Sequence, residues 1–120
     1  MQTGKEKWKF YTDGRIMSSP AVLDGIVYIG SGDGYLYAVD MQTGKKKWRF
    51  RTNDEVYSSP TISGGVILFG SSDGYMYAVD MQTGKEKWKF QTDDAIWSSP
   101  VESSGMVFFG SSDHFLYAVK

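Results

Sequence analysis

Aspartates in glycine-containing turns are the residues of this sequence whose type and spacing most resemble a chemical site. Asp33, Asp73 and Asp113 recur at intervals of 40 residues, each in a Ser-x-Asp loop. Carboxylates in such loops could coordinate calcium, but the further ligands that a D-x-D-x-D loop supplies are missing. Aspartate also shapes tight turns by accepting hydrogen bonds from nearby backbone N–H groups. We therefore predict a turn-shaping role and no metal site.

The single histidine and the paired serines do not combine into a catalytic site. His114 is the only histidine and the chain has no cysteine, so a conventional zinc site is not expected. Serine pairs occur at 18–19, 58–59 and 98–99, but no histidine recurs beside them to act as a base. The sequence thus predicts no catalytic residue, no bound cofactor and no enzyme. The serines are expected to line a polar channel.

Charge and hydropathy argue against nucleic acid and membrane partners. Lysines at 45–47 precede Trp48, but the equivalent runs read Lys-Glu-Lys and acidic loops intervene. The formal net charge is −1, from 13 basic and 14 acidic side chains, so no overall field attracts polyanions. No apolar run approaches the ~20 residues of a membrane helix, and the first residues lack the apolar core of a signal peptide. We expect a soluble chain, and the composition assigns no compartment.

These candidate residues recur because the chain is one 40-residue unit written three times. Aligning 1–40, 41–80 and 81–120 needs no gap, and 19 of the 40 columns hold the same residue in all three units. A fixed period of this length is typical of repeat architectures, in which each unit buries its apolar faces against its neighbours. The position of every candidate side chain therefore depends on how the units stack.

Each unit is expected to form four short β-strands. The first full set is predicted at 17–23, 26–30, 35–39 and 45–50, with glycine-containing turns between the strands. The second strand is apolar throughout, which is typical of burial on both faces. The fourth is rich in lysine, which suits the outer edge of a sheet. Four antiparallel strands in a unit of this length indicate an all-β fold built from β-propeller blades.

Other repeat and all-β folds fit the sequence less well. A β-sandwich would not need so regular a period, and the repeats of a β-helix are far shorter. The Trp-Asp and Gly-His pairs of WD40 repeats are absent. The propeller therefore remains the predicted architecture.

The sequence also resembles the PQQ-type (pyrroloquinoline-quinone-like) β-propeller repeat family. Segments 38–48 and 78–88 match its tryptophan-docking motif, A-x-D-x-x-T-G-x-x-x-W. By this resemblance, each tryptophan would stack near a glycine of a neighbouring blade and hold adjacent blades together. The residues so implied are Gly4, Trp8, Gly44, Trp48, Gly84 and Trp88. Lys120 departs from the motif, because it stands where Asp40 and Asp80 stand in the other units.

The resemblance brings an enzymatic alternative with it. Quinoprotein dehydrogenases of this blade type hold pyrroloquinoline quinone over a calcium ion, with a catalytic aspartate and usually a pair of adjacent cysteines. This chain has no cysteine, and no unique Glu-Asn-Asp set stands out from its repeating turns. Other proteins with these repeats are non-catalytic scaffolds. The sequence favours a non-enzymatic, self-assembling scaffold or interaction module, with a cofactor-less fragment of a quinoprotein dehydrogenase as an alternative.

The order of the strands predicts self-association. Residues 1–10 would supply an outer strand, 11–50 and 51–90 complete blades, and 91–120 three strands of a last blade. The outer strand of one copy could complete the last blade of another. We expect a homodimer of six blades, with a homotrimer of nine as the second choice, because propellers have roughly four to eight blades. Eight blades, common in the family, is not a multiple of three, which suggests a fragment of a longer propeller or an engineered chain.

One rim of the propeller could bind a ligand. The loops that precede each first strand differ most among the units, whereas the Met-Gln-Thr-Gly turns of the opposite rim are invariant. Divergent loops on a repeated frame are a typical place for recognition, although exposed loops also drift without function. The residues of this rim are Arg15, Met17, Glu55, Tyr57, Asp94 and Trp97. A small-ligand or peptide binder, at the rim or in the channel, is thus a further alternative.

Overall fold

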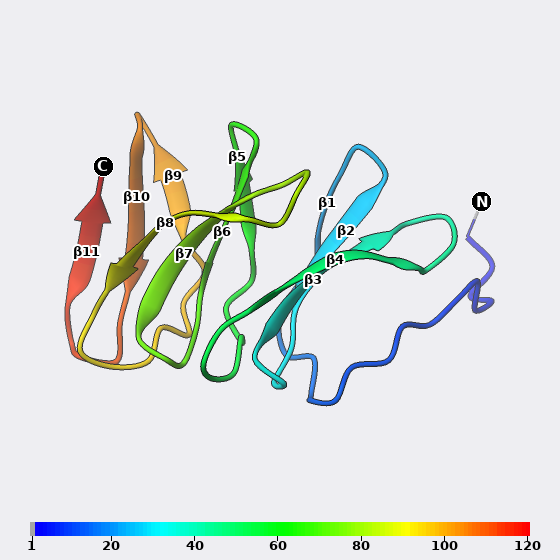
Figure 1. Cartoon of the computed structure of the whole chain (residues 1–120), viewed down its shortest axis with the longest axis horizontal. Helices are drawn as coiled ribbons and strands as arrows, with labels where there is room; N and C mark the ends of the chain where they lie inside the picture. The colour runs from blue at the N-terminus through cyan, green and yellow to red at the C-terminus, as the bar shows by residue number, and fades with distance from the viewer. Residues whose placement is uncertain (1) are drawn as a thin grey trace.

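The computed structural model describes residues 2–120, and this part of the chain is built from β-strands and turns (Figure 1). In chain order the strands are β1 (Ala21–Leu23), β2 (Ile26–Gly30), β3 (Tyr35–Asp40), β4 (Lys46–Arg51), β5 (Thr61–Ser63), β6 (Val66–Gly70), β7 (Tyr75–Asp80), β8 (Glu86–Gln91), β9 (Val101–Ser103), β10 (Met106–Gly110) and β11 (Leu116–Val119).

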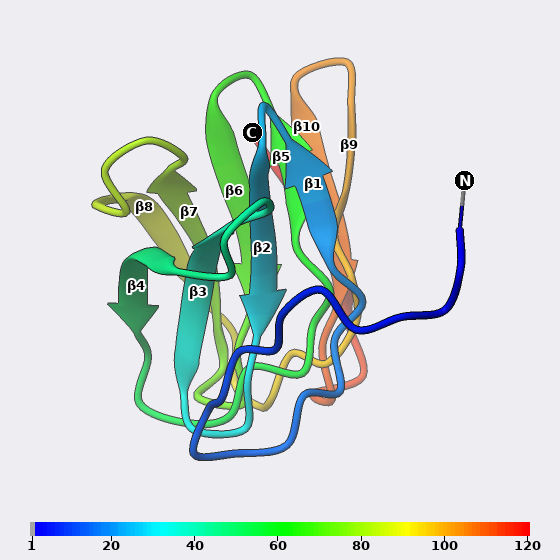
Figure 2. The ribbon, with the colours of Figure 1, turned by 90° about the vertical axis from the view of Figure 1, so that its right-hand side faces the viewer.

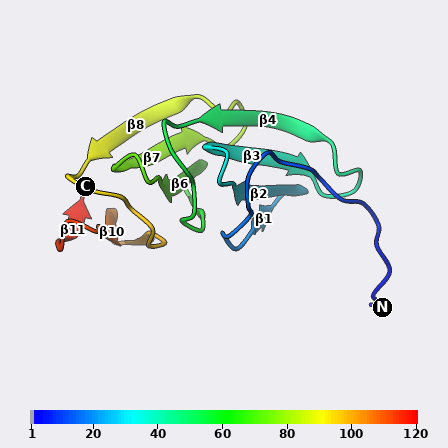
Figure 3. The same cartoon turned by 90° about the horizontal axis from the view of Figure 1, so that it is seen from below.

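The strands form three antiparallel sheets in which neighbours in sequence pair with each other. Their orders are β1-β2-β3-β4, β5-β6-β7-β8 and β9-β10-β11, which we call blades 1, 2 and 3. Seen from below, blades 1 and 2 fan out with β4 and β8 along the outer arc (Figure 3). At the inner side β5 contacts both β1 and β9. The all-β class and the propeller-type blades predicted from the sequence are confirmed.

The core lies between the blades, because alternate residues of a strand point to opposite faces of its sheet. Leu36 of blade 1 and Phe69 of blade 2 belong to one buried cluster between these two sheets. Met76 of blade 2 and Phe109 of blade 3 belong to a second cluster between the next two. Each blade therefore depends on its neighbours for burial, as expected of a repeat fold.

The first strand of each blade is shorter than predicted. The prediction placed it at 17–23, but β1 begins at Ala21. Upstream of it, Gly30 donates its backbone N–H to Ser18 Oγ (2.9 Å), and Ser19 donates its own to Ser59 Oγ (2.8 Å). Pro20 has no N–H to donate. Side-chain hydrogen bonds thus replace the strand ladder before Ala21, and the prediction was wrong there.

The N-terminal segment does not form the predicted outer strand within this single chain. Residues 2–10 lie outside every strand, while residue 1 lies outside the described part of the chain. The segment runs across the face of blade 1 (Figure 2), where Trp8 and Phe10 pack on the small cluster that includes Val39. A strand needs a partner edge, and β4 already occupies the outer edge of blade 1. The outer strand predicted from residues 1–10 therefore has no partner within the described part of this chain.

Candidate functional site

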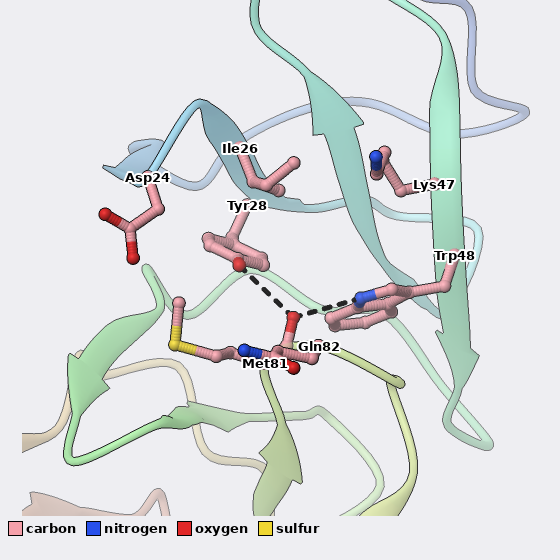
Figure 4. A pocket seen from close by; sticks show the side chains of 7 residues that line it. All are labelled: Asp24, Ile26, Tyr28, Lys47, Trp48, Met81 and Gln82. Atoms are coloured by element: carbon pink, nitrogen blue, oxygen red, sulfur yellow. Dashed lines mark hydrogen bonds between the residues drawn. The ribbon is translucent and has the colours of Figure 1, made fainter.

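Trp48 connects blade 1 to the Met-Gln-Thr-Gly turn of blade 2. It lies on β4 opposite Ala38 of β3. Its indole Nε1 and the hydroxyl of Tyr28 both donate to the carbonyl oxygen of Met81, each over 3.2 Å (Figure 4). A Cβ added to Gly84 would lie 2.5 Å from the indole ring, so only glycine fits beneath it. Tyr28, Trp48 and Met81 border an inter-blade cavity of about 240 Å³.

Trp8 makes the same contact with blade 1. Its Nε1 donates to the carbonyl oxygen of Met41 over 2.9 Å, and a Cβ added to Gly44 would lie 2.6 Å from its ring. Gly4 has a similar backbone conformation, with φ of +78° against +74° for Gly44, but it has nothing within 4 Å of an added Cβ. Trp88 packs against the cluster between blades 2 and 3. Trp8 and Trp48 thus lie over Gly44 and Gly84, and the docking role of the tryptophans and glycines stays a prediction.

A second set of contacts between blades was not foreseen from the sequence. A Cβ added to Gly30 would lie 2.4 Å from Val56 Cγ1, and one added to Gly70 would lie 2.2 Å from Ile96 Cγ2. Val56 and Ile96 are both completely buried. The glycines that end β2 and β6 therefore each accept an aliphatic side chain of the next blade. The available indication was that this glycine and a β-branched residue at the pairing position recur in every unit.

Three of the predicted rim residues come together. An added Cβ on Gly32 would lie 3.1 Å from Arg15 N and 3.2 Å from the hydroxyl of Tyr57. Partial loss of hydration and then the negative charge of Glu55 raise the pKa of Tyr57, while Arg15 opposes both. The hydroxyl of Tyr57 therefore lies beside the backbone of Arg15, and the charges of Arg15 and Glu55 both act on it.

The other three rim residues are more loosely connected. Trp97 donates from Nε1 to Ser72 Oγ over 2.9 Å, and Ser72 in turn donates its N–H to the carbonyl oxygen of Glu55. Asp94 uses its carboxylate within its own loop, where it accepts the N–H of the next residue over 2.7 Å. Met17 is exposed. The rim therefore offers exposed side chains of mixed character.

The recurring aspartates are engaged in their own turns. Asp33 accepts hydrogen bonds from the N–H of Tyr35 (3.0 Å), the N–H of Asp13 (3.3 Å) and the hydroxyl of Tyr37. Burial and then the bond to Asp33 raise the pKa of Tyr37, so the phenol keeps its proton. The second and third units repeat the arrangement. Within residues 2–120, no three His, Cys, Asp or Glu side chains gather where they could hold a metal.

The second serine of each pair takes part in a ladder of hydrogen bonds between blades, just before the first strand of each blade. Ser19 donates its N–H to Ser59 Oγ over 2.8 Å, and Ser59 donates its N–H to Ser99 Oγ over 3.1 Å. The hydroxyls serve as acceptors for the backbone of the preceding blade. Such a ladder joins blades and holds no group that would activate a hydroxyl as nucleophile.

The face of blade 3 that points away from blade 2 is open. Leu116 is 78% exposed, whereas Leu36 and Met76 at the same position of blades 1 and 2 are 0% exposed. Strand β11 pairs with β10 alone, while β3 and β7 each have two partners. Both an apolar face and a sheet edge are therefore accessible at this end.

The stacked antiparallel sheets, two of four strands and one of three, define the chain as a set of β-propeller blades. A family model described as outer membrane protein assembly factor BamB matches residues 1–120. The chain belongs to this family, which confirms the PQQ-type repeats predicted from its sequence. No curated protein matches the chain.

Solved structures with the same fold are much longer than this chain. BamB from Moraxella catarrhalis has a TM-score of 0.80 at 22% identity, over 98% of this chain and 37% of that one. The quinohemoprotein alcohol dehydrogenase from Comamonas testosteroni has a TM-score of 0.80 at 25% identity, over 88% of this chain and 19% of that one. A quinohemoprotein alcohol dehydrogenase from Pseudomonas putida HK5 has a TM-score of 0.80 at 22% identity, over 93% of this chain and 19% of that one. These similarities establish the fold and leave the activity open.

The part of the chain that the structure describes contains no helix with the length and apolar character to cross a membrane.

Proposed function

We propose that this chain is a non-enzymatic β-propeller module that assembles with copies of itself. The observation that carries the proposal is the free edge of β11, together with the segment 5–10, which lies outside every strand. An unpaired edge presents a row of backbone donors and acceptors to another chain. A segment that repeats the sequence of β4 and β8 is suited to pair with it.

The side chains whose types could carry out chemistry support a structural role instead. Each recurring aspartate accepts hydrogen bonds from its own loop and from a tyrosine, and His114 is exposed in a turn. Pyrroloquinoline quinone and calcium, which the dehydrogenase relatives imply, do not fit these residues, because the carboxylates are already engaged and cysteine is absent. We therefore assign no catalytic step to the chain.

The mass in solution tests the proposal. We expect a homodimer of about 27 kDa, twice the 13.5 kDa of one chain, by light scattering across a size-exclusion peak. About 40.5 kDa, three times the mass of one chain, would support the nine-bladed homotrimer instead. A folded chain that stays at 13.5 kDa at all concentrations would contradict self-assembly.

A second candidate function is binding of a peptide or small polar ligand at the rim. It is favoured by the position of the Tyr57 hydroxyl and the Arg15 backbone over Gly32, and by the charges of Glu55 and Arg15, which act on that hydroxyl. Mixed charge with an aromatic side chain suits a polar ligand better than nucleic acid. NMR titration with short peptides tests it, and chemical shift changes confined to the opposite rim would contradict it.

A further inference from the structure

We infer that the two end faces of this chain are complementary, so that blade 3 of one copy docks on blade 1 of a second copy with Ile16 set against Gly110. The inference rests on the proposed self-assembly and specifies its interface. The partner is a second copy because the contacts inside the chain already show what covers such a face.

The glycine and aliphatic pairs between blades predict this contact. Inside the chain, Gly30 accepts Val56 and Gly70 accepts Ile96, each pair being 26 residues apart. The next glycine of the series is Gly110, and within residues 2–120 no aliphatic side chain covers it: the nearest atom to an added Cβ would be Ser98 Oγ at 3.8 Å.

The aliphatic partner in this series would come from another copy. One repeat earlier than Val56 stands Ile16, which is 47% exposed although Val56 and Ile96 are completely buried. An exposed isoleucine and an open glycine therefore occupy the two ends of the chain, at positions that pack against each other everywhere else.

The surrounding surfaces fit the same arrangement. Ile16 borders an apolar groove of about 160 Å³ on blade 1, together with Trp8, Val27 and Ile29. On the other end, Leu116 stands out from blade 3, whereas its counterparts in blades 1 and 2 are buried against the next blade. Burial of these apolar side chains on one another favours association.

Two further contacts between blades, one at the outer side and one at the inner side, would also repeat across the interface. At the outer side Trp88 of one copy would cover Gly4 of the second, as Trp48 covers Gly84. At the inner side the N–H of Ser99 would donate to Ser19 Oγ of the second copy, continuing the serine ladder.

The N-terminal segment is prepared for this docking. Trp8 and Phe10 already hold it on blade 1 of its own chain. When blade 3 of another copy arrives, segment 5–10 lies where it would extend that blade beyond β11. A segment ordered in advance loses less conformational entropy on binding.

Substitution of Gly110 tests the interface. Gly110→Ala fits the single chain, where an added Cβ has no neighbour closer than 3.8 Å. In the assembly this methyl group would collide with Ile16, so we expect the dissociation constant of the dimer to rise by about tenfold or more. Adding Ile16→Ala in the same chain removes the collision and should restore part of the affinity. Sedimentation equilibrium over a range of concentrations measures both effects.

A second pair of variants tests the outer contact and provides the control. Gly4→Ala and Gly105→Ala introduce the same methyl group at the same φ of +78°, each with open space around it in the single chain. Only Gly4 lies in the inferred interface, so only Gly4→Ala should weaken association. This pair also serves if Gly110→Ala fails to fold.

The outcomes separate the interface from self-assembly itself. A monomeric wild-type chain would overturn both. A wild-type dimer whose affinity is unchanged by Gly110→Ala and by Gly4→Ala would overturn this interface and leave self-assembly standing. Weakening by Gly110→Ala without recovery in the double variant would overturn the pairing with Ile16.

Discussion

His114 occupies a backbone position that suits glycine. Its φ is +82°, and the residues at the same turn of the other units are Gly34 and Gly74, with φ of +92° and +91°. A side chain at positive φ brings Cβ close to the neighbouring backbone, which costs roughly 1 to 3 kcal/mol in folded proteins. The histidine therefore strains the last unit, and in the described structure it takes part in the turn only through its backbone N–H, which donates to the carbonyl oxygen of Ser111 over 3.2 Å.

Replacing this histidine should stabilise the fold. We expect His114→Gly to raise the free energy of unfolding by about 1 kcal/mol, because glycine adopts this φ without strain. Urea denaturation of the wild type and the variant measures the difference. His114→Ala is the control, since it keeps a Cβ at the same φ and should gain much less. Equal gains in both variants would show that the imidazole and not the backbone is the cause.

At the scale of the elements, the Met-Gln-Thr-Gly turns are held by a carboxylate at their start. Asp40 accepts the N–H groups of Gln42 (2.8 Å) and Thr43 (2.9 Å), and Asp80 does the same in the next blade. The bond from Thr43 and then that from Gln42 lower the pKa of Asp40. The charged form of the carboxylate is therefore the one that stabilises the turn that receives each tryptophan.

The pH dependence of stability follows from this pKa shift. A carboxyl whose pKa is lower in the folded state than its usual value of about 3.9 contributes stability above that value. The contribution is lost as the pH falls through the folded-state pKa. We expect the melting temperature to fall between pH 5 and pH 2, and to fall less in the double variant Asp40→Asn, Asp80→Asn. If the melting temperature of the wild type and the variant depended on pH in the same way, these turns would not be the cause of the acid destabilisation.

Most of the strands could be predicted from the sequence, and the reasons for the exceptions are physical. The glycine-containing turns and the apolar second strands predict the bounds of β2 and β3 closely, because hairpin geometry depends on local sequence. The start of β1 was misplaced because Ser18 and Ser19 bond the backbone through side chains, which alternation of apolar residues does not reveal. The packing of Val56 into Gly30 also escaped prediction, since it depends on the distance between two sheets.

At the scale of the whole molecule, the N-terminal segment should decide whether copies assemble. Deleting residues 2–10 removes the segment that would extend the last blade and the aromatic side chains of Trp8 and Phe10. Burial of each aromatic side chain is worth roughly 1.5 to 3 kcal/mol. We expect the truncated chain to elute as a monomer, measured by light scattering. A peptide of residues 1–10 added to it should bind, whereas a scrambled peptide should not. An unchanged assembled mass after truncation would contradict strand exchange.

The family and the blade architecture were predictable at this scale, because the period and the docking motif span the chain. The rim was only partly predictable. The charges of Arg15 and Glu55 act on Tyr57, whereas Asp94 accepts a hydrogen bond within its own loop. The spacing of these residues in the sequence does not reveal this difference. How blades meet across two chains depends on surfaces such as that of Leu116, whose exposure only the folded structure reports.

The short hairpin turns also bear on how this chain folds. Three similar units give each strand alternative partners elsewhere in the sequence, which is a known route to misfolding in repeat proteins. Each turn between β1 and β2, or between β5 and β6, spans two residues, so the correct partner is reached with little loss of loop entropy. Pairing of strands within one hairpin is therefore favoured over pairing with a strand of another unit. Segment 5–10 lies outside every strand of the described chain and has no hairpin partner there, so in the proposed assembly it is the segment that would pair with a second copy.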